Sequence, residues 1–211
     1  MRTMVFILTI ASLCGVRLAL AAVPDDPAGV APLAVGAMAP AFTAREVNGQ
    51  DFHFDPKALR SPVLIIFYRG GWCPYCNTHL KDLRQVEPQI RALGYQVLFL
   101  STDRPELLYS SLQEKVTYRI LSDASMQAAR AFGVAYRLDA NTLKNLQTYG
   151  IDLEGTQGTT NHELPVPSVF IVDRGGVVRF RHYNADYKVR LDAASVLDAA
   201  NSALSTSDPR R

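Results

Sequence analysis

Residues 62–76 of this 211-residue chain read PVLIIFYRGGWCPYC. The first part, up to Tyr68, is a continuous apolar run rich in β-branched side chains, which predicts a strand buried on both faces of a sheet. After a short link, apolar residues recur at three- and four-residue steps from Leu80 to Leu93, so a helix is expected to run to Gly94. The stretch therefore predicts a buried strand, a short turn and a helix that begins at two cysteines.

Cys73 and Cys76 lie where a cysteine pair can do redox chemistry. Thiolate is the reactive form of cysteine, and a free thiol has a pKa of about 8.5. At the start of a helix, Cys73 is expected to lie near roughly half a positive charge from the helix dipole. Pro74 suits the first helical position, and Cys76 follows on the same face of the helix. We therefore expect Cys73 to attack and Cys76 to resolve the mixed disulfide or sulfenic acid.

Two structural roles for the pair are disfavoured. A zinc site with four cysteines is excluded because the chain holds three cysteines and no second pair. A disulfide that closes so short a loop would constrain little of the unfolded chain and would contribute little stability. The pattern therefore favours a redox role.

The first 21 residues have the pattern of a secretory signal, with a charged start, an apolar run of about a dozen residues and small residues before a cut after Ala21. Arg17 interrupts the run before it reaches the roughly 20 apolar residues of a membrane helix, so an uncleaved anchor is the minority alternative. Cleavage would remove Cys14 and leave the CPYC cysteines as the only thiols. We expect an exported protein, periplasmic or secreted, in a compartment that permits disulfides.

Charge and length limit the remaining possibilities. Loss of Arg2 and Arg17 would reduce the basic residues from 22 to 20, equal to the 20 acidic ones. A net charge near zero gives no reason to expect nucleic acid or, after cleavage, a membrane surface as partner. We expect a signal peptide at 1–21, a flexible leader at 22–35, one domain at 36–205 and a tail at 206–211.

Strand and helix signals alternate along the domain. Asn48-Gly49 predicts an early β-hairpin, residues 97–101 predict a second buried strand, and residues 169–181 predict a late hairpin around a glycine turn. A final helix is expected at about 192–204. Residues 137–163 are long for a plain connection, which favours a functional role. This order predicts an α/β fold with a central mixed sheet flanked by helices and an N-terminal β-hairpin extension.

Several motifs resemble one family. Trp72-Cys73-x-x-Cys76 after a buried strand looks like thioredoxin, and the Pro74-Tyr75 dipeptide is that of glutaredoxins. From Gly36 to about Ala200, the order of segments resembles the peroxiredoxins of the alkyl hydroperoxide reductase/thiol-specific antioxidant (AhpC/TSA, redoxin) family, in the thioredoxin-like superfamily. The matching pieces are Ala39-Pro40-x-Phe42, Ser101-Thr102-Asp103, Leu121-Ser122-Asp123, Ala131-Phe132-Gly133-Val134 and Phe170-Ile171-Val172-Asp173. The resemblance implies a thioredoxin-like fold and thiol-based redox activity.

The sequence departs from that family at the substrate site. Peroxiredoxins carry a Thr or Ser three residues before the reactive cysteine and a Pro four residues further back, where this chain has Gly70 and Ile66. They also use an Arg just before the late strand, where this chain has Pro167. Thioredoxins carry a cis-proline facing the dithiol at that place, so we expect a cis bond at Pro167.

A few neighbouring residues are candidates for the site. Trp72 is expected to shape the substrate surface, Pro167 to face the dithiol and Arg69 to steady the Cys73 thiolate, although a surface arginine is an equal alternative for Arg69. His79 could shuttle protons, but an exposed helix histidine is the favoured interpretation. His162 and Glu163 could border the site, but a position on the rim of a loop is the favoured interpretation.

Three functions remain open. The first is a thiol peroxidase, in which Cys73 reduces a hydroperoxide, Cys76 closes the disulfide, and a thioredoxin-like or other external dithiol resets it. The second is a protein dithiol–disulfide oxidoreductase that uses the same residues on a protein disulfide substrate. The third is a copper chaperone, disfavoured because such proteins space their cysteines by three residues. We favour the peroxidase and expect no cofactor and no bound metal.

Overall fold

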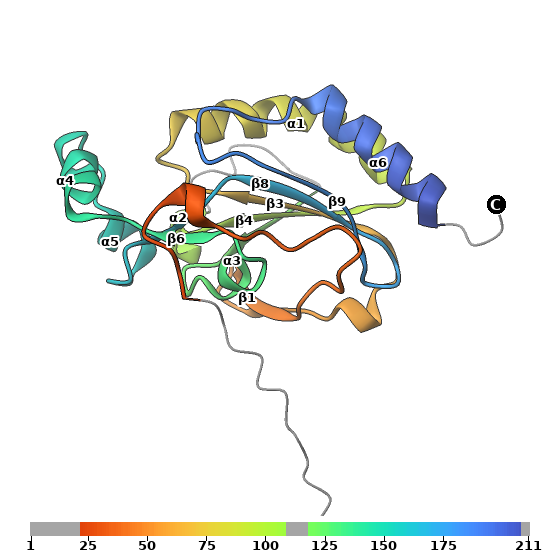
Figure 1. The fold of residues 1–211 in the computed structure, drawn as a ribbon, viewed down its shortest axis with the longest axis horizontal. Helices are drawn as coiled ribbons and strands as arrows, with labels where there is room; N and C mark the ends of the chain where they lie inside the picture. The colour runs from red at the N-terminus through yellow and green to blue at the C-terminus, as the bar shows by residue number, and fades with distance from the viewer. Residues whose placement is uncertain (1–21, 109–117, 208–211) are drawn as a thin grey trace, which may run out of the picture.

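A seven-stranded sheet in the order β2-β1-β5-β4-β3-β8-β9 forms the centre of the molecule (Figure 1). The computed structural model describes residues 22–108 and 118–207. The predicted signal peptide at 1–21 and residues 208–211 of the predicted tail lie outside these described residues. β3 (Val63–Tyr68) lies inside the sheet, parallel to β4 (Gln96–Ser101) and antiparallel to β8 (Ser168–Val172). The mixed sheet confirms the predicted α/β fold.

β3 is buried on both faces, which accounts for its uninterrupted apolar run. Its side chains alternate between two cores because successive residues of a strand point to opposite faces. Ile65 and Phe67 pack on one side, with Phe132 among their neighbours. Leu64, Ile66 and Tyr68 pack on the other side, in the same cluster as both cysteines. The dithiol therefore lies on one defined face of the sheet.

The predicted N-terminal hairpin forms one edge of the sheet. β1 (Phe42–Glu46) and β2 (Asp51–Phe54) pair antiparallel around the Asn48-Gly49 turn. β1 also pairs with β5 (Arg119–Ser122), which joins the hairpin to the central strands. At the other edge, β8 pairs with β9 (Val178–Tyr183), as predicted for the late hairpin.

Helices cover the two faces of the sheet unequally. α1 (Pro74–Ala92) and α6 (Ala193–Ser207) lie over the same face, and α3 (Gln127–Ala131) lies over the opposite one (Figure 1). The short helix α2 (Pro105–Leu108) follows β4. Tyr95, just after α1, ties this layer together by donating a hydrogen bond of 2.8 Å to the Ala200 carbonyl of α6. Within 22–108 and 118–207, no helix combines the length and the apolar character that crossing a bilayer requires.

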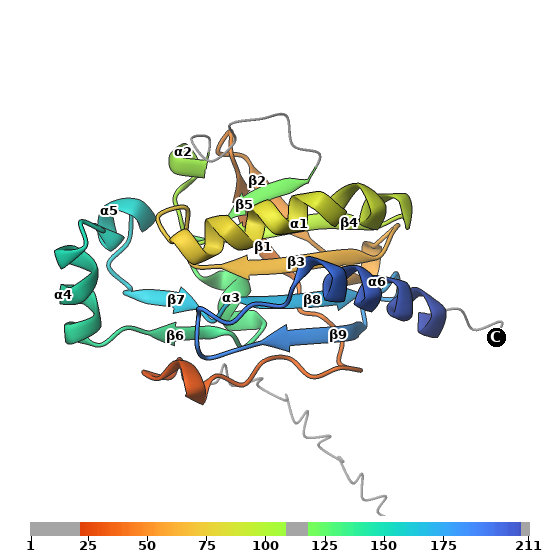
Figure 2. The ribbon, with the colours of Figure 1, turned by 90° about the horizontal axis from the view of Figure 1, so that it is seen from above.

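The long connection at 137–163 is a small substructure beyond the end of the sheet where α1 begins (Figure 2). It holds α4 (Ala140–Thr148) and α5 (Leu153–Gln157), flanked by the antiparallel pair β6 (Ala135–Arg137) and β7 (Glu163–Pro165). Its apolar core also includes the partly buried Trp72. The substructure therefore packs against the turn that leads to Cys73.

Residues 22–35, predicted to be a flexible leader, lie against the domain in this structure. They include a short 3-10 helix at Pro27–Gly29, and the Leu33 N–H donates to the Phe132 carbonyl over 3.0 Å. The Arg181 guanidinium on β9 donates to the carbonyls of Pro32 and Leu33. These contacts use backbone groups, which leave no periodic side-chain pattern in the sequence, and they hold the segment against the domain.

Candidate active site

Cys73 is the N-cap residue of α1, with φ −90° and ψ 113°. Its N–H donates to the Gly70 carbonyl over 3.2 Å, and its own carbonyl accepts from the Cys76 N–H over 3.0 Å. Pro74 takes the first helical position, where a backbone N–H would have no helical partner. Both thiols are free and almost fully buried, with 1% of Cys73 and 0% of Cys76 exposed. The helix start predicted from the sequence therefore places the two thiols together.

The two thiols have opposite tendencies to ionise. The hydrogen bond from the Cys76 thiol lowers the pKa of Cys73 to about 6, against the effect of burial, with further contributions from the backbone and from Arg69 and Arg190. The same hydrogen bond, burial and the Cys73 charge raise the pKa of Cys76. Cys73 is thus the thiolate near neutral pH, and Cys76 is the thiol that donates to it.

Side chains at the end of β4 hold the turn that leads to Cys73. Thr102 Oγ1 donates to the Arg69 carbonyl over 2.7 Å, and Asp103 Oδ2 accepts from the Gly71 N–H over 2.6 Å. From the first turn of α1, Asn77 Nδ2 donates to the Gly71 carbonyl over 2.8 Å. Burial raises the pKa of the Asp103 carboxyl above its ordinary value. These three hydrogen bonds fix the backbone of the turn that positions the Cys73 thiol.

Gly70 leaves no space for a side chain. Its φ is +151°, and a Cβ at this position would lie 2.3 Å from Trp72 Nε1 and 2.8 Å from Asp103 Oδ1. Those two polar atoms are buried and have no hydrogen-bond partner in the described structure. The position at which peroxiredoxins carry their Thr or Ser is therefore filled here by the Trp72 ring.

Arg69 lies between two aromatic rings. Its guanidinium carbon is 4.9 Å from the ring centroid of Trp72 and 4.1 Å from that of Tyr187. Such cation–π contacts hold a guanidinium in place without neutralising its charge. Tyr187 also packs edge-on against Tyr75 at 5.7 Å between centroids. Arg69 is 5% exposed, so it is a buried cation beside the dithiol and not the surface arginine of the alternative interpretation.

The strap, defined here as residues 184–192 between β9 and α6, supplies contacts that no sequence motif indicates. Arg190 Nη2 lies 3.5 Å from Cys76 Sγ, and His79 Nε2 lies 3.0 Å from the Leu191 carbonyl oxygen. Because a carbonyl only accepts, Nε2 of His79 carries the hydrogen. His79 is 7% exposed and burial lowers its pKa to about 4, so the expected exposed helix histidine is wrong. An isolated arginine in a loop has no sequence signal that links it to a thiol 114 residues away.

Pro167 differs from its predicted conformation. The bond from Val166 to Pro167 is trans, so the expected cis-proline is wrong. Val166 donates its N–H to the Val134 carbonyl over 2.8 Å and accepts from the Ser168 hydroxyl over 2.6 Å. The chain therefore passes from β7 to β8 with its backbone already paired. Pro167 is buried and immediately precedes Ser168, the partner of Phe67 near the end of β3.

The remaining candidates lie in other networks. Glu163 is 1% exposed and forms ion pairs with Arg130 at 2.8 Å and Arg137 at 3.2 Å. His162 contacts Glu154 at 2.5 Å. Both residues therefore stabilise the 137–163 substructure. In the part of the chain that the structure describes, no three His, Cys, Asp or Glu side chains form a group that could hold a metal ion.

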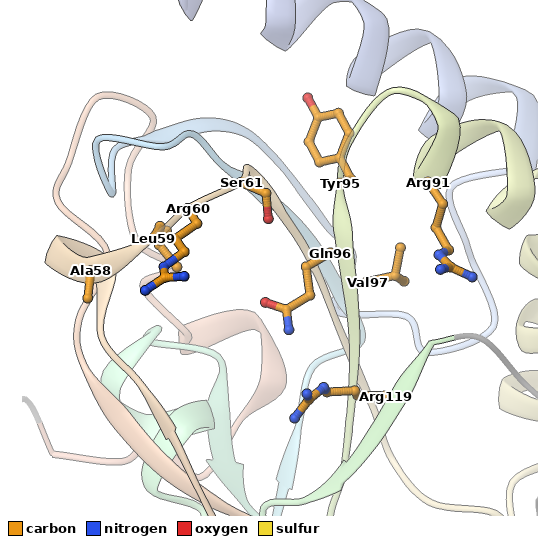
Figure 3. Close-up of a pocket in the computed structure, with 9 residues that line it drawn as sticks. All are labelled: Ala58, Leu59, Arg60, Ser61, Arg91, Tyr95, Gln96, Val97 and Arg119. Carbon is orange, nitrogen blue, oxygen red and sulfur yellow. The ribbon is translucent and has the colours of Figure 1, made fainter.

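A surface hollow of about 500 Å³ lies away from the thiols (Figure 3). It is lined by residues that precede β3 and begin β4 and β5, at the opposite ends of these strands from the dithiol, and by Arg91 of α1. Arg119 in this hollow forms an ion pair with Glu46 at 2.7 Å. The hollow contains no thiol and is not part of the redox site.

Comparison with known proteins identifies the family. Residues 35–181 match the sequence model of the AhpC/TSA family. The chain belongs to the AhpC/TSA family. This membership confirms the peroxiredoxin-like resemblance of the motifs, and the seven-stranded mixed sheet is the scaffold on which this AhpC/TSA member carries its CPYC pair.

Two relatives and one solved structure illustrate the likeness. A bcp peroxiredoxin of Haemophilus influenzae is 37% identical over 105 residues, and peroxiredoxin Bcp of Escherichia coli is 34% identical over 106. Each alignment spans 49% of this chain and 66% of the relative. The crystal structure of peroxidoxin BcpB from Mycobacterium tuberculosis matches with a TM-score of 0.60 at 18% identity, covering 82% of this chain and 97% of that one. This structural likeness confirms the thioredoxin-like fold.

The relatives also correct the expected location. The comparison with the Bcp peroxiredoxins contradicts the predicted location, so the expectation of a periplasmic or secreted protein is wrong. A basic start followed by an apolar run and small residues is a compositional pattern, and a pattern of that kind does not by itself specify export.

Proposed function

We propose that this AhpC/TSA member is a thiol-dependent peroxidase that uses Cys73 and Cys76 as its redox pair. The observation that carries the proposal is the pair of free, buried thiols at the start of α1, with Cys73 as the N-cap residue of the helix. In this setting the pKa of Cys73 is lowered to about 6. Peroxiredoxins act on hydroperoxides and are reduced by thioredoxin-like or glutathione systems, which supports the same chemistry here. We place this activity in the domain at 36–205.

The proposed reaction has three steps. The Cys73 thiolate attacks one oxygen of the hydroperoxide, the O–O bond breaks, and Cys73 sulfenic acid and an alkoxide or hydroxide form, which takes up a proton. The Cys76 thiol loses its proton and attacks the Cys73 sulfur, the S–O bond breaks, and the departing hydroxide takes up a proton to give water and the disulfide. An external dithiol reduces the disulfide by thiol–disulfide exchange. Trp72, Arg69 and Pro167 are proposed to border the space in which the substrate meets Cys73.

One observation favours a second function, the reduction or exchange of protein disulfides. Gly70 has no room for the hydroxyl side chain with which peroxiredoxins hold the peroxide. The Cys73 thiolate would then attack a substrate disulfide, break its S–S bond and form a mixed disulfide. Cys76 would attack the Cys73 sulfur of that mixed disulfide, form the Cys73–Cys76 disulfide and release the reduced substrate thiolate. The two functions differ only in the molecule that oxidises Cys73.

Stopped-flow oxidation of the reduced protein separates the two functions. We expect hydrogen peroxide to oxidise Cys73 far faster than a free thiol, Cys73→Ser to abolish the reaction, and Cys76→Ser to stop it at the sulfenic acid. A rate with peroxide no higher than that of a free thiol, together with rapid reaction with insulin disulfides, would establish the second function instead. Full turnover by Cys73→Ser would contradict both.

A further inference from the structure

One cation from the strap reaches the resolving cysteine. Arg190 Nη2 lies 3.5 Å from Cys76 Sγ, within hydrogen-bond distance for sulfur. Neighbouring strap residues hold this arginine in place, since Tyr187 packs on Arg69 and the Leu191 carbonyl contacts His79. The contact is therefore a consequence of how the strap is docked on α1.

Arg190 has no acidic partner in the ranges 22–108 and 118–207, where the ion pairs involve other residues. Its Nη1 is buried and makes no hydrogen bond in the same part of the structure. Arg190 as a whole is half-buried, but a polar atom that is itself buried is costly unless a group of opposite charge or a hydrogen-bond acceptor faces it. A sulfur that becomes negative during the reaction is such a group.

We propose that Arg190 is a catalytic residue of the resolving step, stabilising the Cys76 thiolate as it attacks the oxidised sulfur of Cys73. The inference rests on the proposed function only in assigning Cys76 as the resolving cysteine. In the reduced protein Cys76 donates its hydrogen to the Cys73 thiolate, which holds Cys76 in the thiol form. Oxidation of Cys73 removes that negative charge, and the attraction of Arg190 for a Cys76 thiolate then acts without this opposition.

Ionisation of Cys76 depends on every charged or titratable group that faces it. These groups include Tyr68 of β3, Tyr136 of β6, Cys73 at the start of α1 and Arg190 of the strap, and the backbone of Arg69 also hydrogen-bonds to Cys76. Tyr68 and Tyr136 both have a pKa raised by burial, so they remain neutral across the working range. Once Cys73 is oxidised, Arg190 is the charged group of this set whose side chain contacts Cys76 Sγ.

The disulfide reagent 5,5′-dithiobis-(2-nitrobenzoate) isolates this step without peroxide. Cys73 thiolate attacks the reagent, forms a mixed disulfide and releases one thionitrobenzoate, at a rate that rises with reagent concentration. Cys76 thiolate then attacks the Cys73 sulfur, forms the Cys73–Cys76 disulfide and releases a second thionitrobenzoate, at a rate independent of concentration. The Cys76 proton passes to solvent. Both releases are followed by absorbance in a stopped-flow instrument.

Arg190→Gln is expected to slow the second release about three- to tenfold at neutral pH and to leave the first release within about twofold. Loss of a close opposite charge raises a thiol pKa by about one unit or more, and the higher nucleophilicity of the more basic thiolate offsets part of the lost thiolate fraction. The slowing of the second release should become smaller as the pH is raised. Arg190→Lys, which keeps the charge, should recover part of the rate. Arg174→Gln, in the exposed turn between β8 and β9, is the matched control and should behave as the wild type.

A wild-type second release in Arg190→Gln would overturn the inference. So would an equal slowing of both releases, because Arg190 would then act on Cys73. Failure of the proposed function would look different, with both releases intact and peroxide oxidation no faster than that of a free thiol.

Discussion

The carboxylate of Asp103 accepts a hydrogen bond from the backbone N–H of Gly71 over 2.6 Å. Asp103 follows β4, and Gly71 lies two residues before the reactive Cys73. Asp103 is 3% exposed, and its second oxygen has no partner in the described structure. The bond therefore couples the end of a central strand directly to the position of the thiol.

Replacing Asp103 tests this coupling. Asp103→Ala should lower the free energy of unfolding by about 1–3 kcal/mol, because it leaves the Gly71 N–H without its acceptor. It should also slow the reaction of the Cys73 thiolate, because the turn before Cys73 loses the hydrogen bond that holds it. Asp103→Asn keeps an acceptor oxygen and should stay close to the wild type. Urea denaturation and the first thionitrobenzoate release measure the two effects, and equal behaviour of the Ala and Asn variants would contradict this role.

The reactivity of Cys73 should follow its ionisation. With a pKa of about 6, its rate of alkylation by iodoacetamide should rise with pH and reach half its plateau near pH 6. Cys76→Ala removes the hydrogen bond that contributes most to this shift, so the midpoint should move to higher pH. An unchanged midpoint in Cys76→Ala would show that the neighbouring arginines and the helix start are sufficient by themselves.

Restoring the hydroxyl residue of peroxiredoxins at position 70 should damage the site. Gly70→Thr places a Cβ against Trp72 and Asp103 at a positive φ, and should lower stability by about 1–3 kcal/mol or more. Trp72 is the only tryptophan, so its fluorescence should report the displaced ring. Gly150→Ala, which has positive φ and nothing within 4 Å, is the control for backbone strain alone. A threonine variant with wild-type fluorescence and faster peroxide reduction would contradict this account.

Asp123 should make stability depend on pH. Burial raises its pKa from 3.8 to about 7, against hydrogen bonds donated by backbone N–H groups at the start of α3. Between these pH values the folded protein binds more protons than the unfolded chain, so the free energy of unfolding falls as pH rises, by up to about 4 kcal/mol, and levels off above pH 7. Asp123→Asn should flatten this slope in urea titrations at pH 4–8. Parallel slopes in the two proteins would rule out Asp123 as the source.

The local sequence pattern was sufficient to predict most of the fold. The run at 63–68, the Asn48-Gly49 turn and the late hairpin all formed as predicted, because burial on one or both faces of a strand leaves a direct mark on residue order. Segments held by backbone contacts were not predictable in this way. Residues 22–35 are held by contacts such as the bond from the Leu33 N–H to the Phe132 carbonyl, which no side-chain pattern marks. The bond before Pro167 has the ordinary trans form, and the position of a proline in the sequence does not by itself specify the cis form.

The residue order alone predicts that Cys73 begins a helix and that Cys76 lies one turn further on the same face, because helix geometry relates residues three apart. The surroundings of the two cysteines follow from the packing of distant segments. Arg190 reaches Cys76 from a strap whose path depends on the order of β8, β9 and α6. A single charged residue in a loop has no periodicity, so its sequence position does not reveal this contact. His79 already lies one turn after Cys76 on α1, and the contact with the Leu191 carbonyl of the strap is what the fold adds.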